Sequence, residues 1–245
     1  MAVPNALLGI HSAIAWQLIS PYDKVMSQLR PTLNNWGNGY LLRVLPSGSY
    51  AKGTAVAGGS DVDLFCSISS SVPDTLEQAY TTLCNALKAA GYGIKVQNVS
   101  VGISVLGLKV DVTPGIRRDA QGNDHSIYST KTQSWIKTDI NQQINFVRNS
   151  GRLEEIRWLK RWRNNRGIAW PSYHLELATI SCLKGCSTSL TARNVAQVLA
   201  YLTDASQFAV LNDPANTNNN VASTMSFWER QFLANAARSE LQLLA

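Results

Sequence analysis

The chain has 245 residues, a hydrophobic fraction of 45% and a formal net charge of +6. This length allows one large domain or two small ones, and the apolar content argues against wholesale disorder. Because no run of about 18 apolar residues is present, we expect no membrane span. The N-terminus lacks the basic region that is typical of a signal peptide, so we expect a cytoplasmic location.

The first half of the chain alternates helical and strand-like patterns. The apolar spacing predicts a helix over 6–30, which Pro31 ends or separates from a second short helix. In chain order we then expect a strand over 40–46, a glycine-serine turn with one helical turn, a strand over 60–68, a helix over 73–91, and two strands within 92–115 joined at Gly107. Asp74 is the expected cap of the helix over 73–91, and Gly91 its stop.

The second half of the chain reads differently. A polar loop is predicted over 117–130, followed by helices over 134–150, 152–166, 172–185, 191–201 and 226–243, with a polar loop over 211–223 between the last two. The pattern predicts an α+β protein of two lobes. We expect a catalytic sheet lobe over 1–130, a helical substrate-binding lobe over 131–245, and a cleft between them.

Two carboxylates lie close together on the strand over 60–68. Side chains alternate across a strand, so Asp61 and Asp63 share one face while Val62 and Leu64 point to the other. Carboxylates held this close repel each other unless a cation lies between them or one is protonated. If the strand that carries Asp111 is a neighbour, three carboxylates meet on one face, which suits Mg²⁺ or Mn²⁺. The alternative is a solvated edge strand with surface aspartates.

A turn rich in glycine and serine precedes this strand. Gly48 lets the backbone approach a ligand closely, and the hydroxyl of Ser49 can donate to a phosphate. If a helix starts at Tyr50, its free N–H groups also face the anion. The turn and the carboxylates together predict a site for a metal-bound nucleoside triphosphate.

The stretch "GSYAKGTAVAGGSDVDLF" resembles the signature of the DNA polymerase β nucleotidyltransferase superfamily. That signature is Gly-Ser, a spacer of roughly a dozen residues, Asp-x-Asp between apolar residues, and a later strand aspartate, which Asp111 matches. The resemblance implies that Asp61, Asp63 and Asp111 bind the metal ions and that Asp111 helps to activate the acceptor hydroxyl. It further implies that Gly48 and Ser49 hold the triphosphate.

The helical half resembles one branch of this superfamily, which contains oligoadenylate synthetases, bacterial cyclic-oligonucleotide synthases (CD-NTases), poly(A) polymerases and archaeal CCA-adding enzymes. "EIRWLKRWRNNRG" is similar to the helix whose lysine reaches the triphosphate, which maps to Lys160. "WPSYHLELATI" is similar to the Ser-Tyr helix start of that branch. By this resemblance Ser172 contacts phosphate and Tyr173 lies against the base.

The residues themselves leave alternatives open in this half. Seven Lys or Arg against two Glu form a basic stripe from Arg148 to Arg166, which is either a solvated helix face or a site for a polyanion. Ser172 could simply cap its helix, and Tyr173 could be ordinary core packing. Trp158 and Trp162 are expected in the core. The four cysteines lack zinc-site spacing and are interpreted as small buried hydrophobic residues.

We therefore predict a nucleotidyltransferase that uses Mg²⁺ or Mn²⁺, takes NTP substrates and releases pyrophosphate. The favoured product is an oligo- or cyclic-nucleotide signal. The alternatives are template-independent nucleotide addition to an RNA 3′ end, CCA addition included, transfer of a nucleotide to a protein, and a nucleotide-binding module without activity. An RNA acceptor or activator and the oligomeric state are left open.

Overall fold

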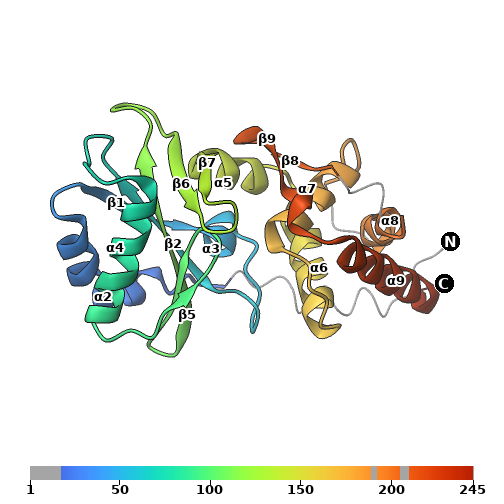
Figure 1. Ribbon diagram of the computed structural model, residues 1–245. Coiled ribbons are helices and arrows are strands. Elements are labelled where there is room, and N and C mark those ends of the chain that lie inside the picture. The colour runs from blue at the N-terminus through green and yellow to red at the C-terminus, as the bar shows by residue number, and fades with distance from the viewer. Residues whose placement is uncertain (1–17, 189–191, 205–209, 245) are drawn as a thin grey trace. The chain divides into compact units, whose positions relative to one another are not determined.

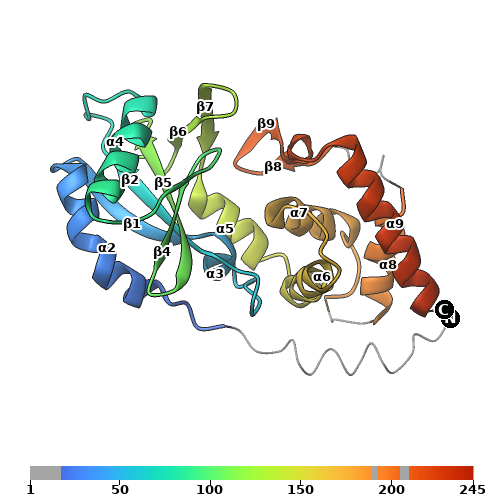
Figure 2. The ribbon, with the colours of Figure 1, turned by 60° about the horizontal axis from the view of Figure 1, so that its bottom comes forward.

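The computed structural model describes residues 18–188, 192–204 and 210–244. They form two compact units, drawn in Figures 1 and 2. The sheet unit comprises Ile19–Ala51 and Ser60–Ile144, and the helical unit comprises Leu18, Lys52–Gly59 and the described residues from Asn145 onward. The predicted α+β class is confirmed. The division into functional lobes after residue 130 stays a prediction.

The sheet unit is built on one seven-stranded sheet. Its strands are β1 Leu41–Ser47, β2 Val62–Ile68, β3 Lys95–Val96, β4 Val101–Val105, β5 Leu108–Arg117, β6 His125–Ser129 and β7 Ser134–Thr138. The order is β1-β2-β5-β4-β3, and β6 pairs with both β5 and β7. The pairing of β2 with β5 is parallel, and every other pairing in this sheet is antiparallel.

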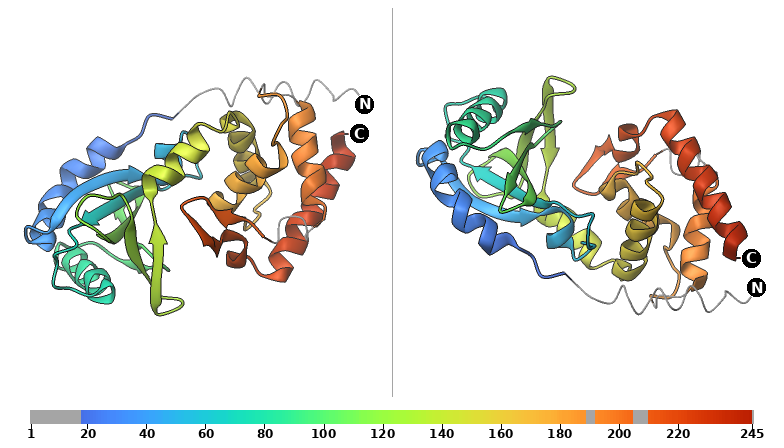
Figure 3. Two further views of the ribbon diagram at one scale, coloured as in Figure 1. Left: turned by 90° about the horizontal axis from the view of Figure 1, so that it is seen from above. Right: turned by 90° about the horizontal axis from the view of Figure 1, so that it is seen from below.

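Two helices cover one face of this sheet, as Figures 1 and 3 show. They are α2 Tyr22–Gly37 and α4 Leu76–Ala89. Their apolar stripes bury Leu29 and Leu83 completely, together with Leu64 of β2 and Val112 of β5. Because strand side chains alternate, the residues between these core positions point to the opposite face of the sheet. That alternation places Asp63 and Asp111 on the face that α2 and α4 leave uncovered.

The ends of these two helices correct two predictions. Pro31 does not end α2, which continues through it to Gly37, because Leu29 and Leu33 on either side are fully buried against the core. The N-cap of α4 is Thr75 rather than Asp74: Thr75 and Gln78 form a reciprocal capping box. Gly91 follows the end of α4 with φ +87°, as a helix stop requires.

The region over 117–138 also differs from its prediction. Part of the predicted polar loop is strand β6, in which His125, Ile127 and Ser129 alternate as buried residues. The predicted helix over 134–150 starts with strand β7, and α5 Ile140–Arg148 follows. A side-chain oxygen of Asp139 accepts from the backbone N–H of Gln142 at 3.0 Å, so this aspartate caps α5.

The helical unit packs four helices around a second core. They are α6 Leu153–Asn165, α7 Ser172–Cys182, α8 Ala192–Leu202 and α9 Phe227–Leu244, seen from both sides in Figure 3. Trp158 and Trp162 lie in this core, as predicted. The predicted polar loop over 211–223 instead holds a small hairpin of β8 Asn212–Asp213 and β9 Asn216–Asn220, followed by the 3-10 helix η1 Val221–Thr224.

Side-chain hydrogen bonds hold this hairpin together. A side-chain oxygen of Asp213 accepts from the N–H of Ala215 at 2.9 Å, and one of Asn220 accepts from the N–H of Leu211 at 3.0 Å. Local bonds of this kind explain why a polar sequence forms strands here.

The cysteines and the membrane prediction can also be compared with the structure. Cys66 and Cys84 are buried, as predicted, whereas Cys182 and Cys186 are partly exposed, and all four are free thiols. Within the described part of the chain, no helix combines the length and the apolar character that crossing a membrane requires.

Candidate active site

Two of the three predicted carboxylates meet on one sheet face. In the parallel pairing of β2 with β5, Asp63 is the direct partner of Asp111, so both side chains lie on the same face at adjacent positions. Asp61 lies just before the first residue of β2 and is exposed. The expectation that the strand of Asp111 neighbours that of Asp63 is confirmed.

Gly48 lies directly against one of these carboxylates. It is the first residue of α3 Gly48–Lys52 and has φ +58°, a backbone conformation that glycine adopts without strain. A Cβ atom built on Gly48 would overlap the carboxylate of Asp63. Both the positive φ and the lack of space for a Cβ atom therefore explain why this residue is glycine. The glycine-serine turn, in which Ser49 follows Gly48, lies beside the acidic strand.

Asp111 is held from its other side by β4 and the segment before it. The Nε2 of Gln97 donates to Oδ1 of Asp111 at 2.8 Å. Gly102 pairs with Asp111 across β4 and β5, and a Cβ at Gly102 would lie only 2.7 Å from Gln97 Nε2 and 3.2 Å from Asp111 Oδ1. Because Gly102 has no side chain, there is room for the hydrogen bond from Gln97 that orients Asp111.

The electrostatics of this cluster favour a positive ligand. Burial raises the pKa of Asp111 above its ordinary value, and the negative charge of Asp61 raises it further, while the Gln97 hydrogen bond and two lysines counteract both effects. A carboxylate in this state is stabilised by a cation or by a proton. Among the described residues, no three His, Cys, Asp or Glu side chains gather closely enough to hold a metal ion by themselves. The aspartates still fit Mg²⁺, which takes one or two carboxylates together with substrate phosphates.

The helical unit contains a second charged cluster, centred on Glu176 of α7. Oε2 of Glu176 accepts from Lys52 Nζ at 2.9 Å, and Oε1 accepts from Lys160 Nζ at 2.7 Å. The hydroxyl of Thr54 also donates to Oε1, at 2.7 Å. Only 1% of the side chains of Lys160 and Glu176 is exposed. The predicted phosphate ligand Lys160 therefore lies inside a buried ion-pair network, which we call the Glu176 network: Lys52, Thr54, Lys160 and Glu176.

The Glu176 network holds more positive than negative charge. Burial pulls the pKa of Glu176 upward, but the ammonium groups of Lys52 and Lys160 and two hydrogen bonds outweigh burial and hold that pKa at about 2. Burial lowers the pKa of Lys160, and the nearby charges of Lys52 and Arg163 lower it further against the attraction of Glu176. One carboxylate is shared by two ammonium groups, so it is firmly ionised while they compete for it.

Ser172 and Tyr173 flank this network. Ser172 is the first residue of α7, whose N-cap is Pro171 and has no side-chain capping bond, so capping does not explain the serine. Instead Ser172 Oγ accepts from Nη1 of Arg163 at 3.0 Å. The ring of Tyr173 lies 3.9 Å from Lys52 Nζ, a cation–π contact, and its hydroxyl donates to Asp213 Oδ1 at 2.9 Å. The proposed roles of both residues toward a nucleotide stay predictions.

Most of the basic stripe is buried rather than solvated. Arg152, Arg157, Lys160 and Arg163 are each at most 8% exposed. Arg152 donates to the carbonyls of Leu183 and Cys186 just after α7, and Arg157 donates to the carbonyl of Gly53 at 2.8 Å. The stripe is thus neither a solvated helix face nor a continuous surface track.

Sequence reasoning missed four residues of these clusters: Lys52, Thr54, Gln97 and Glu176. Glu176 could have been found, because a lone carboxylate in the apolar run "LELATI" indicates a buried partner. Lys52 and Thr54 follow the glycine-serine turn directly, but nothing in their spacing shows that they join the helical unit. Gln97 lies within the stretch predicted as two strands, and alternation there does not show that its side chain bonds Asp111.

No family model matches the chain. The cyclic AMP-AMP-AMP synthase of Escherichia coli strain MS 115-1 is 29% identical over 133 residues, which cover 51% of this chain and 41% of that protein. The match thus spans about two fifths of this relative.

Solved structures match over almost the whole chain. CdnC of E. coli MS115-1, solved with ATP, has a TM-score of 0.72 at 22% identity and covers 99% of this chain and 86% of its own. CdnG of Bradyrhizobium diazoefficiens, a CD-NTase in complex with GTP, has a TM-score of 0.76 at 15% identity and covers 99% and 92%. The fold is that of the CD-NTases. The resemblance drawn from the sequence is confirmed at this level.

Proposed function

We propose that this chain is a nucleotidyltransferase that transfers an NMP group from an NTP to a hydroxyl acceptor and releases pyrophosphate. The observation that carries the proposal is the in-register pair of Asp63 and Asp111, with Gly48 against the carboxylate of Asp63. The fold supports it, since CdnC and CdnG were solved with ATP and GTP. So does the matched segment of the cyclic AMP-AMP-AMP synthase.

The aspartates have distinct proposed roles. Asp61 and Asp63, with Asp111, would hold Mg²⁺ or Mn²⁺, which would lower the pKa of the attacking hydroxyl and neutralise charge on the triphosphate. Asp111, whose pKa is raised, is suited to accept the proton of that hydroxyl. Gly48 and Ser49 would hold the triphosphate. Lys160, Ser172 and Tyr173 stay predicted nucleotide contacts.

We further propose that the product is an oligo- or cyclic-nucleotide signal rather than an extended RNA. An enzyme that extends RNA draws much of its affinity from basic side chains along the acceptor backbone. The basic stripe was the best sequence candidate for such a track, but four of its seven basic side chains are buried in the helical unit. That burial favours a free nucleotide as acceptor.

Product analysis tests the proposal. The purified chain is incubated with four NTPs and Mg²⁺ or Mn²⁺, with and without total tRNA, and the products are resolved by size. We expect small oligomeric or phosphatase-resistant products without RNA, and none from Asp63→Ala. Asp23→Ala, which changes an exposed aspartate of the same unit, is the matched control. Labelling confined to RNA 3′ ends would favour the RNA-extending alternative, and turnover by Asp63→Ala would refute the site.

A further inference from the structure

A cavity lies in the sheet unit, away from the aspartates. It has a volume of about 180 Å³ and is lined by the end of α2, the end of β2 and the start of α4. Ile68, which lines it, is the last residue of β2, whereas Asp63 lies near the first. Five residues of strand separate them by about 17 Å at roughly 3.3 Å per residue. The cavity is therefore separate from the proposed active site, and we call it the Trp36 pocket.

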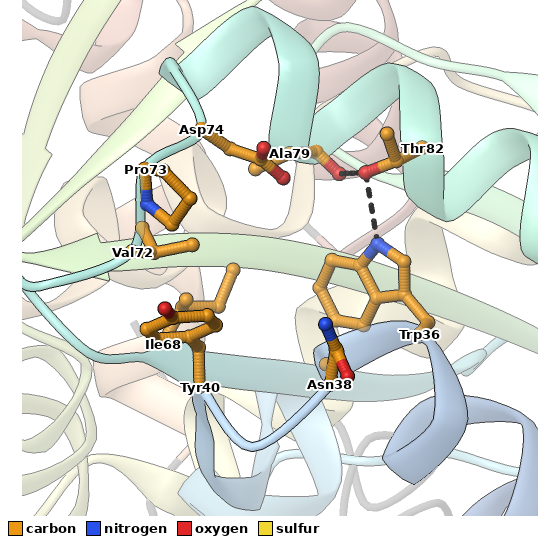
Figure 4. A pocket seen from close by; sticks show the side chains of 10 residues that line it. Trp36, Asn38, Tyr40, Ile68, Val72, Pro73, Asp74, Ala79 and Thr82 are labelled. Carbon is orange, nitrogen blue, oxygen red and sulfur yellow. Dashed lines mark hydrogen bonds between the residues drawn. The ribbon is translucent and has the colours of Figure 1, made fainter.

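The charges around the Trp36 pocket favour a cation. Although the protein carries a net charge of +6, none of the residues lining this pocket is lysine or arginine. Asp74 projects a carboxylate toward the pocket (Figure 4), and this carboxylate has no hydrogen-bond or ion-pair partner among the described residues. Asn38 reaches into the same space from the α2 side. Because the carboxylate of Asp74 is unpaired and the lining has no basic residue, the pocket would repel an anion.

The ends of two helices also contribute to the electrostatic field at the Trp36 pocket. The C-terminal end of α2 carries partial negative charge, which the N–H groups of Asn38 and Tyr40 reduce by donating to its last carbonyls and which no basic side chain in the last turn offsets. At the start of α4, where free N–H groups would attract an anion, the capping box engages two of them, those of Thr75 and Gln78. The α2 end therefore contributes a weak negative field, and the positive field of the α4 end is partly offset.

The walls and size of the pocket select a small flat group. The indole of Trp36 forms one wall and is fixed by its Nε1, which donates to Thr82 Oγ1 at 3.0 Å (Figure 4). Tyr40, Ile68 and Pro73 complete the apolar lining. Ligand sites for whole small molecules are usually about 300–1,000 Å³, so this pocket is too small for a nucleotide. A planar guanidinium can stack on an indole and bind a carboxylate through two N–H groups.

We propose that the Trp36 pocket binds a guanidinium group on an aliphatic chain, stacked on Trp36 and paired with Asp74. The guanidinium comes either from an arginine side chain of a partner protein or from a free small molecule such as agmatine. This site is independent of the proposed nucleotidyl transfer, because it uses none of the residues assigned to that reaction.

Nuclear magnetic resonance of the ¹⁵N-labelled full chain tests the proposal. The indole N–H signal of Trp36, assigned with Trp36→Phe, is followed during titration with agmatine and with Nα-acetyl-arginine methylamide. We expect a saturable shift of this signal, while the other indole signals stay in place. Equal or tighter binding of the blocked arginine assigns the site to a protein side chain, and binding of agmatine alone assigns it to a free small molecule.

Three comparisons make the test decisive. Nα-acetyl-citrulline methylamide has the same shape without the charge, and should bind at least about tenfold more weakly, as should the blocked arginine to Asp74→Asn. Asp23→Asn, an exposed aspartate on α2, should leave the affinity unchanged. No saturable shift with either probe, equal binding of citrulline, or unchanged affinity in a folded Asp74→Asn would overturn the proposal.

Discussion

The two units of this protein differ in how their charged side chains are paired. In the sheet unit, Asp61 and Asp111 repel each other and burial raises the pKa of Asp111. In the helical unit, Glu176 is fully ionised between two ammonium groups inside a closed network. In the first cluster like charges face each other, whereas in the second a carboxylate is paired with two cations. Substitutions in the two clusters should therefore have different consequences: loss of activity in the first and loss of stability in the second.

The largest effect is expected at Asp63. Asp63→Ala removes a proposed metal ligand, and NTP turnover should fall by about 10³-fold or more, since each tenfold loss corresponds to about 1.4 kcal/mol of barrier and metal stabilisation supplies several. The free energy of unfolding without metal should stay the same or rise, because a like charge has been removed. Turnover is measured by pyrophosphate release and stability by urea unfolding. A large loss of stability in Asp63→Ala would contradict the proposed difference between the two units, because the aspartates would then stabilise the fold.

Glu176→Gln should show the opposite pattern. It leaves Lys52 and Lys160 buried without a carboxylate, and breaking a buried ion pair in this way costs about 3–5 kcal/mol. Urea unfolding of the variant measures this loss. Lys160→Met is the matched control, because it leaves the Lys52–Glu176 pair intact and should cost clearly less. If the two variants lost equal stability, Glu176 would not be the centre of the network.

Lowering the pH should gradually remove the stabilisation that the ionised carboxylate of Glu176 provides. The pKa of Glu176 is about 2 in the folded protein and its ordinary value is 4.5, so its contribution is complete above pH 4.5 and is lost as the pH falls toward 2. The full contribution is about 3 kcal/mol. The difference in unfolding free energy between the wild type and Glu176→Gln should therefore shrink over this interval. A difference that stays constant from pH 6 to pH 2.5 would contradict the assigned pKa.

A smaller effect on stability is expected at Gly48. Alanine there must adopt a positive φ, at a cost of about 1–3 kcal/mol, and its Cβ would also displace the carboxylate of Asp63. Gly91→Ala imposes a similar backbone strain at φ +87° but has open space around its Cβ. Both variants should lose stability in thermal unfolding, and only Gly48→Ala should also lose turnover. Normal turnover by a folded Gly48→Ala would show that the glycine-serine turn is not part of the active site.

The sheet unit was more predictable than the helical unit, and its strands show why. Alternation along "DVDLF" fixes which side chains share a face, so the meeting of Asp63 with Asp111 followed once β2 and β5 were neighbours. Strand β6 was missed because His125 and Ser129 look polar, yet both are buried. His125 is held there by a hydrogen bond of 2.8 Å to Ser67, a tertiary contact that local pattern does not encode.

In the helical unit, the pairing of the charged side chains was not predicted, because their partners lie far away in the sequence. Lys52 and Lys160 lie far apart in the sequence, yet both donate to the carboxylate of Glu176. The face of α6 that carries Arg157, Lys160 and Arg163 was therefore not recognised as buried, and the solvated surface that its charges suggested is not present. The segment Lys52–Gly59 supplies part of that burial although it follows the glycine-serine turn of the other unit.

The most direct test of the central claim is a titration of Mn²⁺ binding by electron paramagnetic resonance, in which the signal of free Mn²⁺ decreases as the ion is bound. Wild type and Asp63→Asn are compared with and without a non-hydrolysable ATP analogue. We expect the wild type to bind more Mn²⁺ than the analogue alone can account for, and Asp63→Asn to lose this excess while it remains folded. Equal Mn²⁺ binding by the two proteins would contradict the assignment of the aspartates as the metal site.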